Sequence, residues 1–139
     1  MSDRDEEIIA PSRHFYEAFN RDDFDAATEV AHPGIELVRP TGQPPLRGAD
    51  ALRAWMQPDA FEEQQLEALE FSVKGNKVLV RDQATGRGAG SGIEVDDDGW
   101  TVWTLNDDGL ATRLEFYLDH QEAEALEAAG LSEYAKNQT

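Results

Sequence analysis

The chain has 139 residues, no cysteine, and 29 acidic against 12 basic residues, which gives a formal net charge of −17. A length of this order suits one domain, residues 1–139, that buries a core without disulfides. The lack of cysteine excludes thiolate metal ligands and a cysteine nucleophile. The negative charge would repel phosphate backbones, so we expect no nucleic-acid partner.

Other classes of site have little support in the sequence. No apolar run approaches the ~18 residues of a membrane-spanning helix, so we expect no membrane partner and a cytoplasmic location. The three histidines share no metal-ligand spacing, and we expect no metal. The glycine-rich stretch 86–92 lacks the lysine and the strand-to-helix context of a phosphate loop, so we expect no cofactor there or elsewhere.

The N-terminal third has helical patterns. Apolar residues recur at helical spacing within 8–19, and Pro11 either starts this helix at the next residue or kinks a longer one. Asp22 or Asp23 can cap a second, short helix. A His-Pro-Gly turn at 32–34 ends it.

Most of the remaining chain alternates as β-strands do. Leu69, Phe71 and Val73 are expected to share one face of their strand, and Asp-Asp-Asp-Gly at 96–99 is expected to turn. Asn-Asp-Asp-Gly at 106–109 should join the last two strands as a hairpin. The expected strands are 35–40, 66–74, 77–88, 100–105 and 110–118.

Two further helices are expected, one over 49–57 with Trp55 inward and one at the end of the chain. Asp119 and Glu122 can form a capping box for the last helix, and Gly130 can end it. Helices followed by antiparallel strands predict an α+β fold. We expect a cone-shaped, curved antiparallel sheet wrapped around the N-terminal helices, with a C-terminal helix and a cavity inside the cone.

Two segments carry a family resemblance: RHFYEAFNRDDFDAATEVAHPGIELVRP near the start and VWTLNDDGLATRLEFYLDHQEAEALEAAGL near the end. Together they resemble the nuclear transport factor 2-like superfamily, in particular its SnoaL-like branch of small polyketide cyclases. The resemblance implies a homodimer through the convex face of the sheet, to which Arg113, Glu115 and Tyr117 could contribute. This fold hosts isomerases, cyclases, epoxide hydrolases, dehydratases and proteins without chemistry, so the resemblance does not imply one reaction.

The resemblance can be carried onto known catalytic positions. The helical tyrosine of the ketosteroid isomerase type falls at Phe15, and Tyr16 faces roughly 100° away. The general base of that type falls at Arg39 and its second acid at Thr101. One aspartate of the limonene epoxide hydrolase type falls at Phe116. We therefore expect no inward carboxylate or histidine, and the catalytic residues stay unassigned.

Arg39 is the most unusual residue in this pattern. The alternation that points Leu37 toward the core points Arg39 there as well. Because an unpaired buried cation costs several kcal/mol, Arg39 needs a partner. It either clamps an anion or carbonyl of a ligand, or forms a structural salt bridge to a carboxylate on the 49–57 helix or a neighbouring strand.

Two functional hypotheses follow. The first is acid/base chemistry on a small apolar ketone, polyketide or epoxide, with Arg39 as the electrophile. The second is a non-catalytic ligand-binding or dimerisation module that keeps the pocket and lacks the acid. A cavity-facing group with a shifted pKa would favour the enzyme, and a cavity filled by aromatic side chains would favour the module. The expected ligand-binding residues are Phe15, Phe19, Leu37, Arg39, Trp55, Thr101, Trp103 and Phe116.

Overall fold

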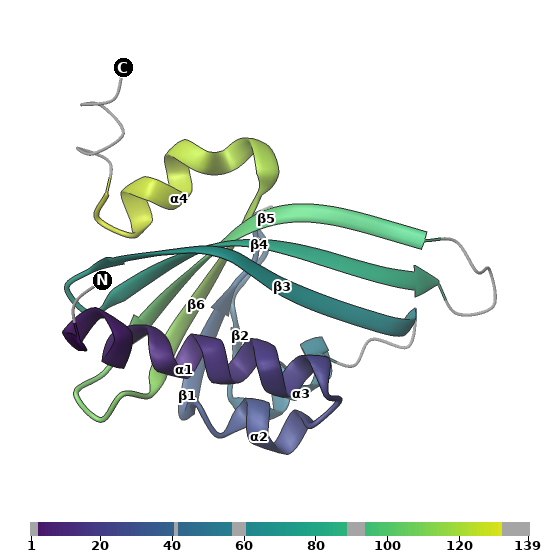
Figure 1. Ribbon diagram of the computed structural model, residues 1–139, viewed down its shortest axis with the longest axis horizontal. Coiled ribbons are helices and arrows are strands. Elements are labelled where there is room, and N and C mark those ends of the chain that lie inside the picture. The colour runs from purple at the N-terminus through teal and green to yellow at the C-terminus, as the bar shows by residue number, and fades with distance from the viewer. Residues whose placement is uncertain (1–2, 41, 57–60, 89–93, 132–139) are drawn as a thin grey trace.

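The computed structural model describes residues 3–40, 42–56, 61–88 and 94–131, and has the α+β architecture that the sequence predicts (Figure 1). Helices α1, α2 and α3 lie on one side of a curved sheet, and α4 lies on the other (Figure 1). The helices are α1 (Asp3–Asn20), α2 (Phe24–Thr28), α3 (Ala49–Met56) and α4 (Glu122–Ala128), with a 3₁₀ turn over Asp119–Gln121. The strands are β1 (Ala31–Val38), β2 (Leu46–Arg47), β3 (Phe61–Lys74), β4 (Lys77–Gly88), β5 (Glu94–Leu105) and β6 (Ala111–Leu118).

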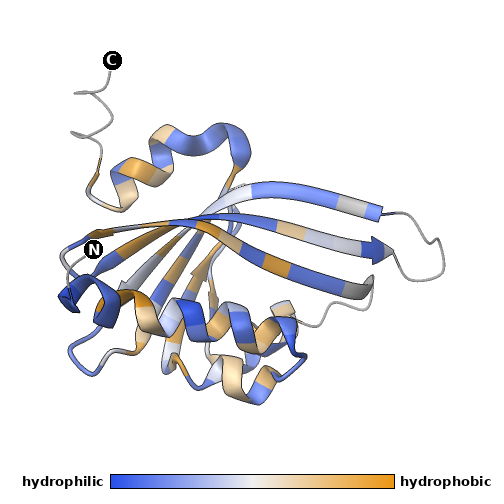
Figure 2. Ribbon diagram, viewed as in Figure 1, coloured by the Kyte–Doolittle hydropathy of each residue, from blue (hydrophilic) through white to orange (hydrophobic). Residues whose placement is uncertain are grey.

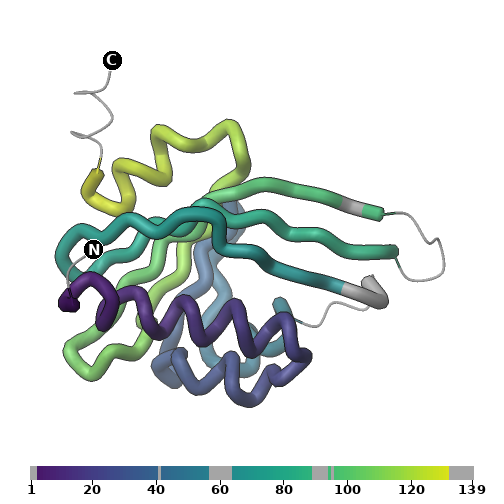
Figure 3. The backbone as a smooth tube through the Cα atoms, in the orientation of Figure 1, coloured from purple at the N-terminus to yellow at the C-terminus, as the bar shows by residue number. Residues whose placement is uncertain are grey.

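The described strands form one sheet in the order β2-β1-β6-β5-β4-β3. Every neighbouring pair is antiparallel except β1 with β6, which are parallel and place Leu37 beside Leu114. The three long strands β3, β4 and β5 curve together past the helices (Figure 3). This curvature gives the sheet a concave face that receives α1.

Helix α1 packs into that concave face over a wide arc. Phe15, Tyr16 and Phe19 are all buried, although Phe15 and Tyr16 point in different directions around the helix. A helix that lies inside a curved sheet is contacted on more than one side, so side chains on both faces of α1 are buried. The helix runs through Pro11, so the longer of the two predicted helices is observed.

Hydropathy follows this arrangement. The inner sides of the helices and the strands they face carry the apolar residues, whereas the far ends of β4 and β5 are mostly hydrophilic (Figure 2). Among the described helices, none is both long and apolar enough to cross a membrane.

Several local predictions are confirmed. Asp23 caps α2 by accepting a hydrogen bond from the Ala26 backbone N–H at 3.1 Å. Gly130 follows α4 with a φ of 79°, a left-handed conformation that glycine adopts without strain. The 106–109 turn joins β5 and β6, which pair antiparallel.

The predicted turn at 96–99 is wrong, because these residues belong to β5. They pair with β4, where Asp96 lies opposite Thr85 and Asp98 lies opposite Gln83. The Gln83 amide donates to Asp96 at 3.0 Å, so a neighbouring polar side chain stabilises this acidic stretch in an extended form.

The predicted face of β3 is also partly wrong. The pairing with β4 slips between Ala68 and Glu70, so Leu69 is the extra residue of a β-bulge and is 49% exposed. The bulge lies beside Asp82, the partner of Ala68. The strand that was expected to begin at residue 35 begins at Ala31, so the His-Pro-Gly sequence lies inside an irregular part of β1.

The capping box predicted for the last helix is not formed. The Gln121 side chain accepts from the Leu118 backbone N–H at 2.8 Å, and a 3₁₀ turn precedes α4. The Asp119 carboxylate instead pairs with Arg81 at 2.5 Å. The side chain that the sequence predicts as a helix cap therefore pairs with an arginine on β4 instead.

Candidate functional site

A cavity of about 590 Å³ opens between the helices and the concave face of the sheet. Its walls are mainly aromatic. Phe15 packs edge-on against Trp103 with ring centroids 5.3 Å apart, and Trp55 stacks on Phe116 at 4.8 Å. A volume of this size accommodates a small organic molecule.

Asp82 is the chemically distinctive residue of this cavity. It lines the cavity from β4, and its Oδ2 accepts two hydrogen bonds, from the Tyr16 hydroxyl at 2.9 Å and the Thr101 hydroxyl at 2.7 Å. Tyr16 comes from α1 and Thr101 from β5, so three elements converge on one carboxylate oxygen. We call these three residues the Asp82 cluster.

Burial changes the acidity of the cluster. It raises the pKa of the Asp82 carboxyl above its ordinary value, and the hydrogen bonds from Thr101 and Tyr16 offset this only in part. Burial also raises the pKa of the Tyr16 hydroxyl well above its ordinary value, and the nearby Asp82 charge raises it further. Tyr16 therefore stays a hydrogen-bond donor, while Asp82 is the member that can exchange a proton.

The second oxygen of Asp82, Oδ1, faces a glycine on the neighbouring strand. Asp82 lies directly opposite Gly99 on β5, and a Cβ at that glycine would come within 3.5 Å of Oδ1 and 3.0 Å of the Tyr117 backbone oxygen. Because position 99 has no side chain, Oδ1 is not covered from that side. Oδ2 is thus held by two hydroxyls, and Oδ1 has no side chain crowding it from position 99.

The expectation of no inward carboxylate is therefore wrong. Val78 and Val80 are fully buried on the concave face of β4, and strand alternation carries that face on to Asp82. Continued alternation along β4 therefore predicts an inward Asp82. The catalytic positions that the family resemblance implies lie on the first helix, the first strand and the last two strands, and none of them lies on β4.

Arg39 also lines the cavity, as the alternation predicts. It donates from Nη2 to the Pro44 backbone carbonyl at 2.7 Å, and its buried Nε has no hydrogen-bond partner. Within the described part of the chain no carboxylate forms an ion pair with Arg39, and this includes Asp50, the one acid of α3. The predicted salt bridge to α3 or a neighbouring strand is not formed among these residues.

The eight predicted ligand-binding residues divide into two groups. Phe19 and Leu37 are buried in the core behind the cavity and do not line it. The residues that the structure brings together around the cavity are Phe15, Arg39, Trp55, Thr101, Trp103 and Phe116.

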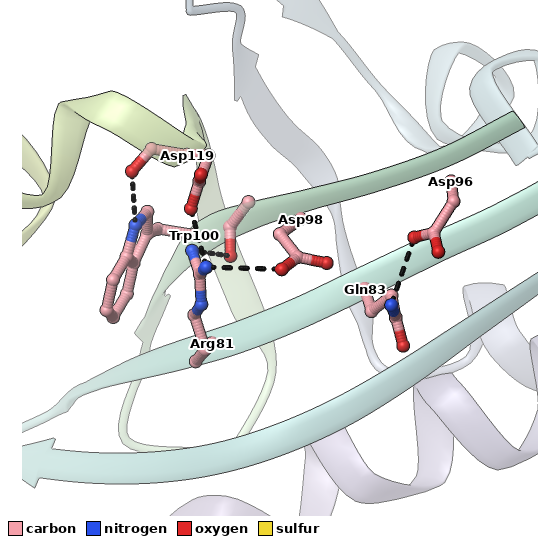
Figure 4. A network of polar contacts seen from close by, with 7 residues as sticks. Arg81, Gln83, Asp96, Asp98, Trp100 and Asp119 are labelled. Carbon is pink, nitrogen blue, oxygen red and sulfur yellow. Dashed lines mark hydrogen bonds and ion pairs between the residues drawn. The ribbon is translucent and has the colours of Figure 1, made fainter.

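A second polar network is drawn in Figure 4, and three of its residues, Asp98, Trp100 and Asp119, also line the cavity. Arg81 pairs with Asp119 at 2.5 Å and with Asp98 at 3.4 Å, and its guanidinium stacks 4.5 Å over the Trp100 ring. The Trp100 indole N–H donates to the Asp119 backbone oxygen at 3.2 Å. This network ties β4, β5 and the 3₁₀ turn together and offsets part of the negative charge of its carboxylates.

The donor set at the cavity is that of an organic-ligand site. Among the described residues, no three His, Cys, Asp or Glu side chains gather closely enough to hold a metal ion. The Asp82 carboxyl, the Tyr16 and Thr101 hydroxyls and the Arg39 guanidinium line the cavity, and together they can exchange a proton and hold an oxygen-bearing ligand. The cavity is also lined by Asp97, Asp98, Asp119 and His120.

Comparison with known proteins agrees with this geometry. The model of the SnoaL-like domain family matches residues 12–114. No curated protein sequence matches the chain. Among solved structures, a proposed polyketide cyclase from Xanthomonas campestris is 22% identical, with 85% of this chain and 94% of that chain covered and a TM-score of 0.73.

Two further structures are similar. SalBIII, an epoxide hydrolase/cyclase-like enzyme with a role in pyran ring formation in the polyether salinomycin, is 19% identical, covers 88% of this chain and 97% of its own, and has a TM-score of 0.74. TerC, co-crystallised with polyporic acid, is 24% identical to this chain. The match covers 87% of this chain and 98% of TerC, with a TM-score of 0.71. At these identities the likeness is one of fold.

Proposed function

We propose that this chain, which belongs to the SnoaL-like domain family, is an enzyme that moves protons on a small, largely apolar ketone or polyketide, with Asp82 as general acid and base. The observation that carries the proposal is the Asp82 carboxyl, which lines the aromatic cavity and has a raised pKa. A general base works best when its pKa lies near the working pH, and burial moves an aspartate in that direction.

The open cavity supports an enzyme over a purely structural module. A purely structural module would be expected to fill this space with its aromatic side chains, whereas here Phe15, Trp55, Trp103 and Phe116 line a cavity of about 590 Å³. The ligand classes are suggested by the fold relatives described above, which are a proposed polyketide cyclase, an enzyme with a role in pyran ring formation, and a protein co-crystallised with polyporic acid.

In the step we propose, Oδ1 of ionised Asp82 takes a proton from a carbon beside the substrate carbonyl. The electron pair of that C–H bond moves into the enolate. The same carboxyl then returns its proton to another atom of the same molecule, so no co-reactant is needed. Tyr16 and Thr101 hold Oδ2 in place throughout.

The test measures proton transfer directly. The α-protons of 2-tetralone exchange with solvent in D₂O, and NMR follows their loss. We expect the wild-type protein to accelerate this exchange at least ~100-fold over buffer, the lower range for a positioned acid/base group. Asp82→Asn should abolish the acceleration, because the amide cannot take the proton.

Asp107→Asn is the matched control, since it also removes one carboxylate but lies exposed in the β5–β6 turn away from the cavity. It should keep the full acceleration. Equal rates for wild type and Asp82→Asn would contradict the proposal and would favour the ligand-binding module instead.

We further propose that two copies of the chain associate through the convex face of the sheet. Glu115 is 7% exposed and accepts from the Tyr117 hydroxyl at 2.8 Å, so these two residues form a satisfied pair inside one chain. Arg113 is more exposed and is the residue through which this face can reach a second copy. Sedimentation of wild type and Arg113→Glu at micromolar concentration tests this, and a monomeric wild type would contradict it.

A further inference from the structure

No carboxylate among the described residues forms an ion pair with the half-buried Arg39. Arg81, which has a similarly shielded side chain, pairs with two carboxylates, whereas Arg39 has one backbone carbonyl and an unbonded Nε. The chain has 29 acidic residues, so a carboxylate partner was readily available. A guanidinium kept at a cavity wall without a carboxylate can bind one that arrives from outside.

The position of Arg39 in the sheet defines what lies beside it. The parallel register of β1 and β6 pairs Val38 with Glu115, so the next residues, Arg39 and Phe116, are neighbours on the concave face. Phe116 in turn pairs with Thr101 on β5. Arg39, Phe116 and Thr101 therefore form a row across the sheet, and the last of these residues belongs to the Asp82 cluster.

The length of that row limits the size of the ligand. Arg39 directly follows β1 and Asp82 lies on β4, and these two strands are three steps apart in the sheet order. At about 4.8 Å per step the strands are ~14 Å apart across the sheet, and both side chains reach inward over part of that span. One or two fused rings bridge the remaining distance.

The aromatic rings beside this row of residues favour flat ligands. Trp55 and Phe116 are stacked with an interplanar angle of 20°, so they present parallel flat surfaces at this end of the cavity. Flat conjugated molecules pack well against such surfaces. The guanidinium then lies near the edge of the bound ring, where an acidic substituent can reach it.

We infer that the cavity takes a planar aromatic or conjugated acid whose carboxylate binds Arg39 and whose opposite end reaches Asp82. This inference deepens the proposed function and rests on it for the reactive end, while the acid-binding end stands on the contacts of Arg39 alone. Arg39 acts here as a specificity residue that holds the substrate.

The test uses two probes of the same shape, 2-naphthoate and 2-naphthamide, with calorimetry on the full chain. We expect the wild-type protein to bind the acid at least ~10-fold more tightly than the amide. Arg39→Gln should weaken the acid to the level of the amide and leave the amide unchanged. Arg39→Lys should fall between, because it keeps the charge and loses the planar fork.

Two further variants separate this inference from the proposed function. Arg47→Gln removes an exposed arginine of β2 that does not line the cavity, and it should keep the wild-type preference. Asp82→Asn should also keep the preference for the acid while it loses proton exchange. If the wild-type protein prefers the acid over the amide but does not accelerate proton exchange, the proposed function is contradicted and the acid-binding site is still supported.

Three results overturn the inference. The first is equal binding of acid and amide by the wild type. The second is an Arg39→Gln protein that still prefers the acid. The third is no binding of either probe up to about 1 mM. A Kd above this value corresponds to a binding free energy weaker than about −4 kcal/mol, less than a specific binding site should give.

Discussion

Asp82 combines two features that pull its acidity in opposite directions. Burial favours the neutral acid, and the hydroxyls of Thr101 and Tyr16 favour the carboxylate. Burial wins, so the pKa of Asp82 is raised. The balance depends on individual atoms, and single substitutions around Asp82 should therefore move its titration without changing the fold.

We expect Thr101→Val and Tyr16→Phe each to raise the pKa of Asp82 further, because each removes a donor to the carboxylate. The shift should be larger for Thr101→Val, whose hydrogen bond is 2.7 Å long against 2.9 Å for Tyr16. The ¹³Cγ chemical shift of Asp82, followed by NMR over pH, measures both changes.

Thr104→Val is the matched control for Thr101→Val. Thr104 lies on the same strand, and its buried hydroxyl has no hydrogen-bond partner among the described residues. Its removal should leave the Asp82 titration unchanged. The account fails if Thr101→Val also leaves the titration unchanged.

The raised pKa of Asp82 also makes stability depend on pH. The folded protein binds this proton more tightly than the unfolded chain, so the free energy of unfolding falls as pH rises from the ordinary value of 3.8 through the folded pKa. Asp82→Asn has no such proton. The stability of Asp82→Asn relative to wild type should therefore increase with pH over this window and then level off.

Urea unfolding of both proteins in steps between about pH 4 and pH 8 measures that difference. The comparison with Asp82→Asn cancels the other carboxylates, which titrate in both proteins. A difference that stays constant across the range would show that Asp82 has the same pKa in the folded and unfolded chain.

At the scale of single elements, alternation in the strands is the most informative sequence pattern. It places Arg39 at the cavity, and continued from Val80 it would have placed Asp82 there too. It fails at Leu69, because a β-bulge shifts the faces and nothing in the local sequence marks it. It also cannot tell that Tyr16 reaches Asp82, since this depends on how α1 lies in the sheet.

Helix α1 carries an internal defect at Pro11. Proline has no N–H to donate to the Glu7 carbonyl four residues earlier, and its ring crowds that carbonyl. We expect Pro11→Ala to raise the free energy of unfolding by about 1–2 kcal/mol, after allowance for the greater freedom of the unfolded alanine chain. Chemical denaturation measures the change.

Pro33→Ala serves as the comparison, because Pro33 lies in the irregular part of β1 and no helical hydrogen bond is regained there. Its effect should be smaller. Equal effects of the two substitutions would mean that the helix already accommodates Pro11 at no cost.

At the scale of the whole molecule, charge is the dominant feature. With 29 acids and 12 bases, repulsive pairs outnumber attractive ones, and exposed ion pairs such as Arg47–Glu36 contribute little. Self-repulsion of this kind destabilises the compact state, and added salt screens it. Salt should therefore stabilise this protein.

We expect the Tm at pH 7 to rise by several degrees between about 20 and 500 mM NaCl, over which the Debye length falls severalfold. The rise should shrink near the isoelectric point of about 4.3, where repulsion is weakest. Differential scanning calorimetry at both pH values measures it. A Tm that falls with salt at pH 7 would mean that attractive ion pairs outweigh the repulsion.

The parallel pairing of β1 with β6 has a consequence for how the protein is made. Leu37 and Leu114 are neighbours in the sheet although more than half of the chain separates them. Contacts so distant in sequence form late and slowly. During synthesis β1 can take its place in the sheet only after β6 has been made, so Arg39 joins Thr101 and Asp82 only at that point. A nascent chain without β6 does not have the complete cavity.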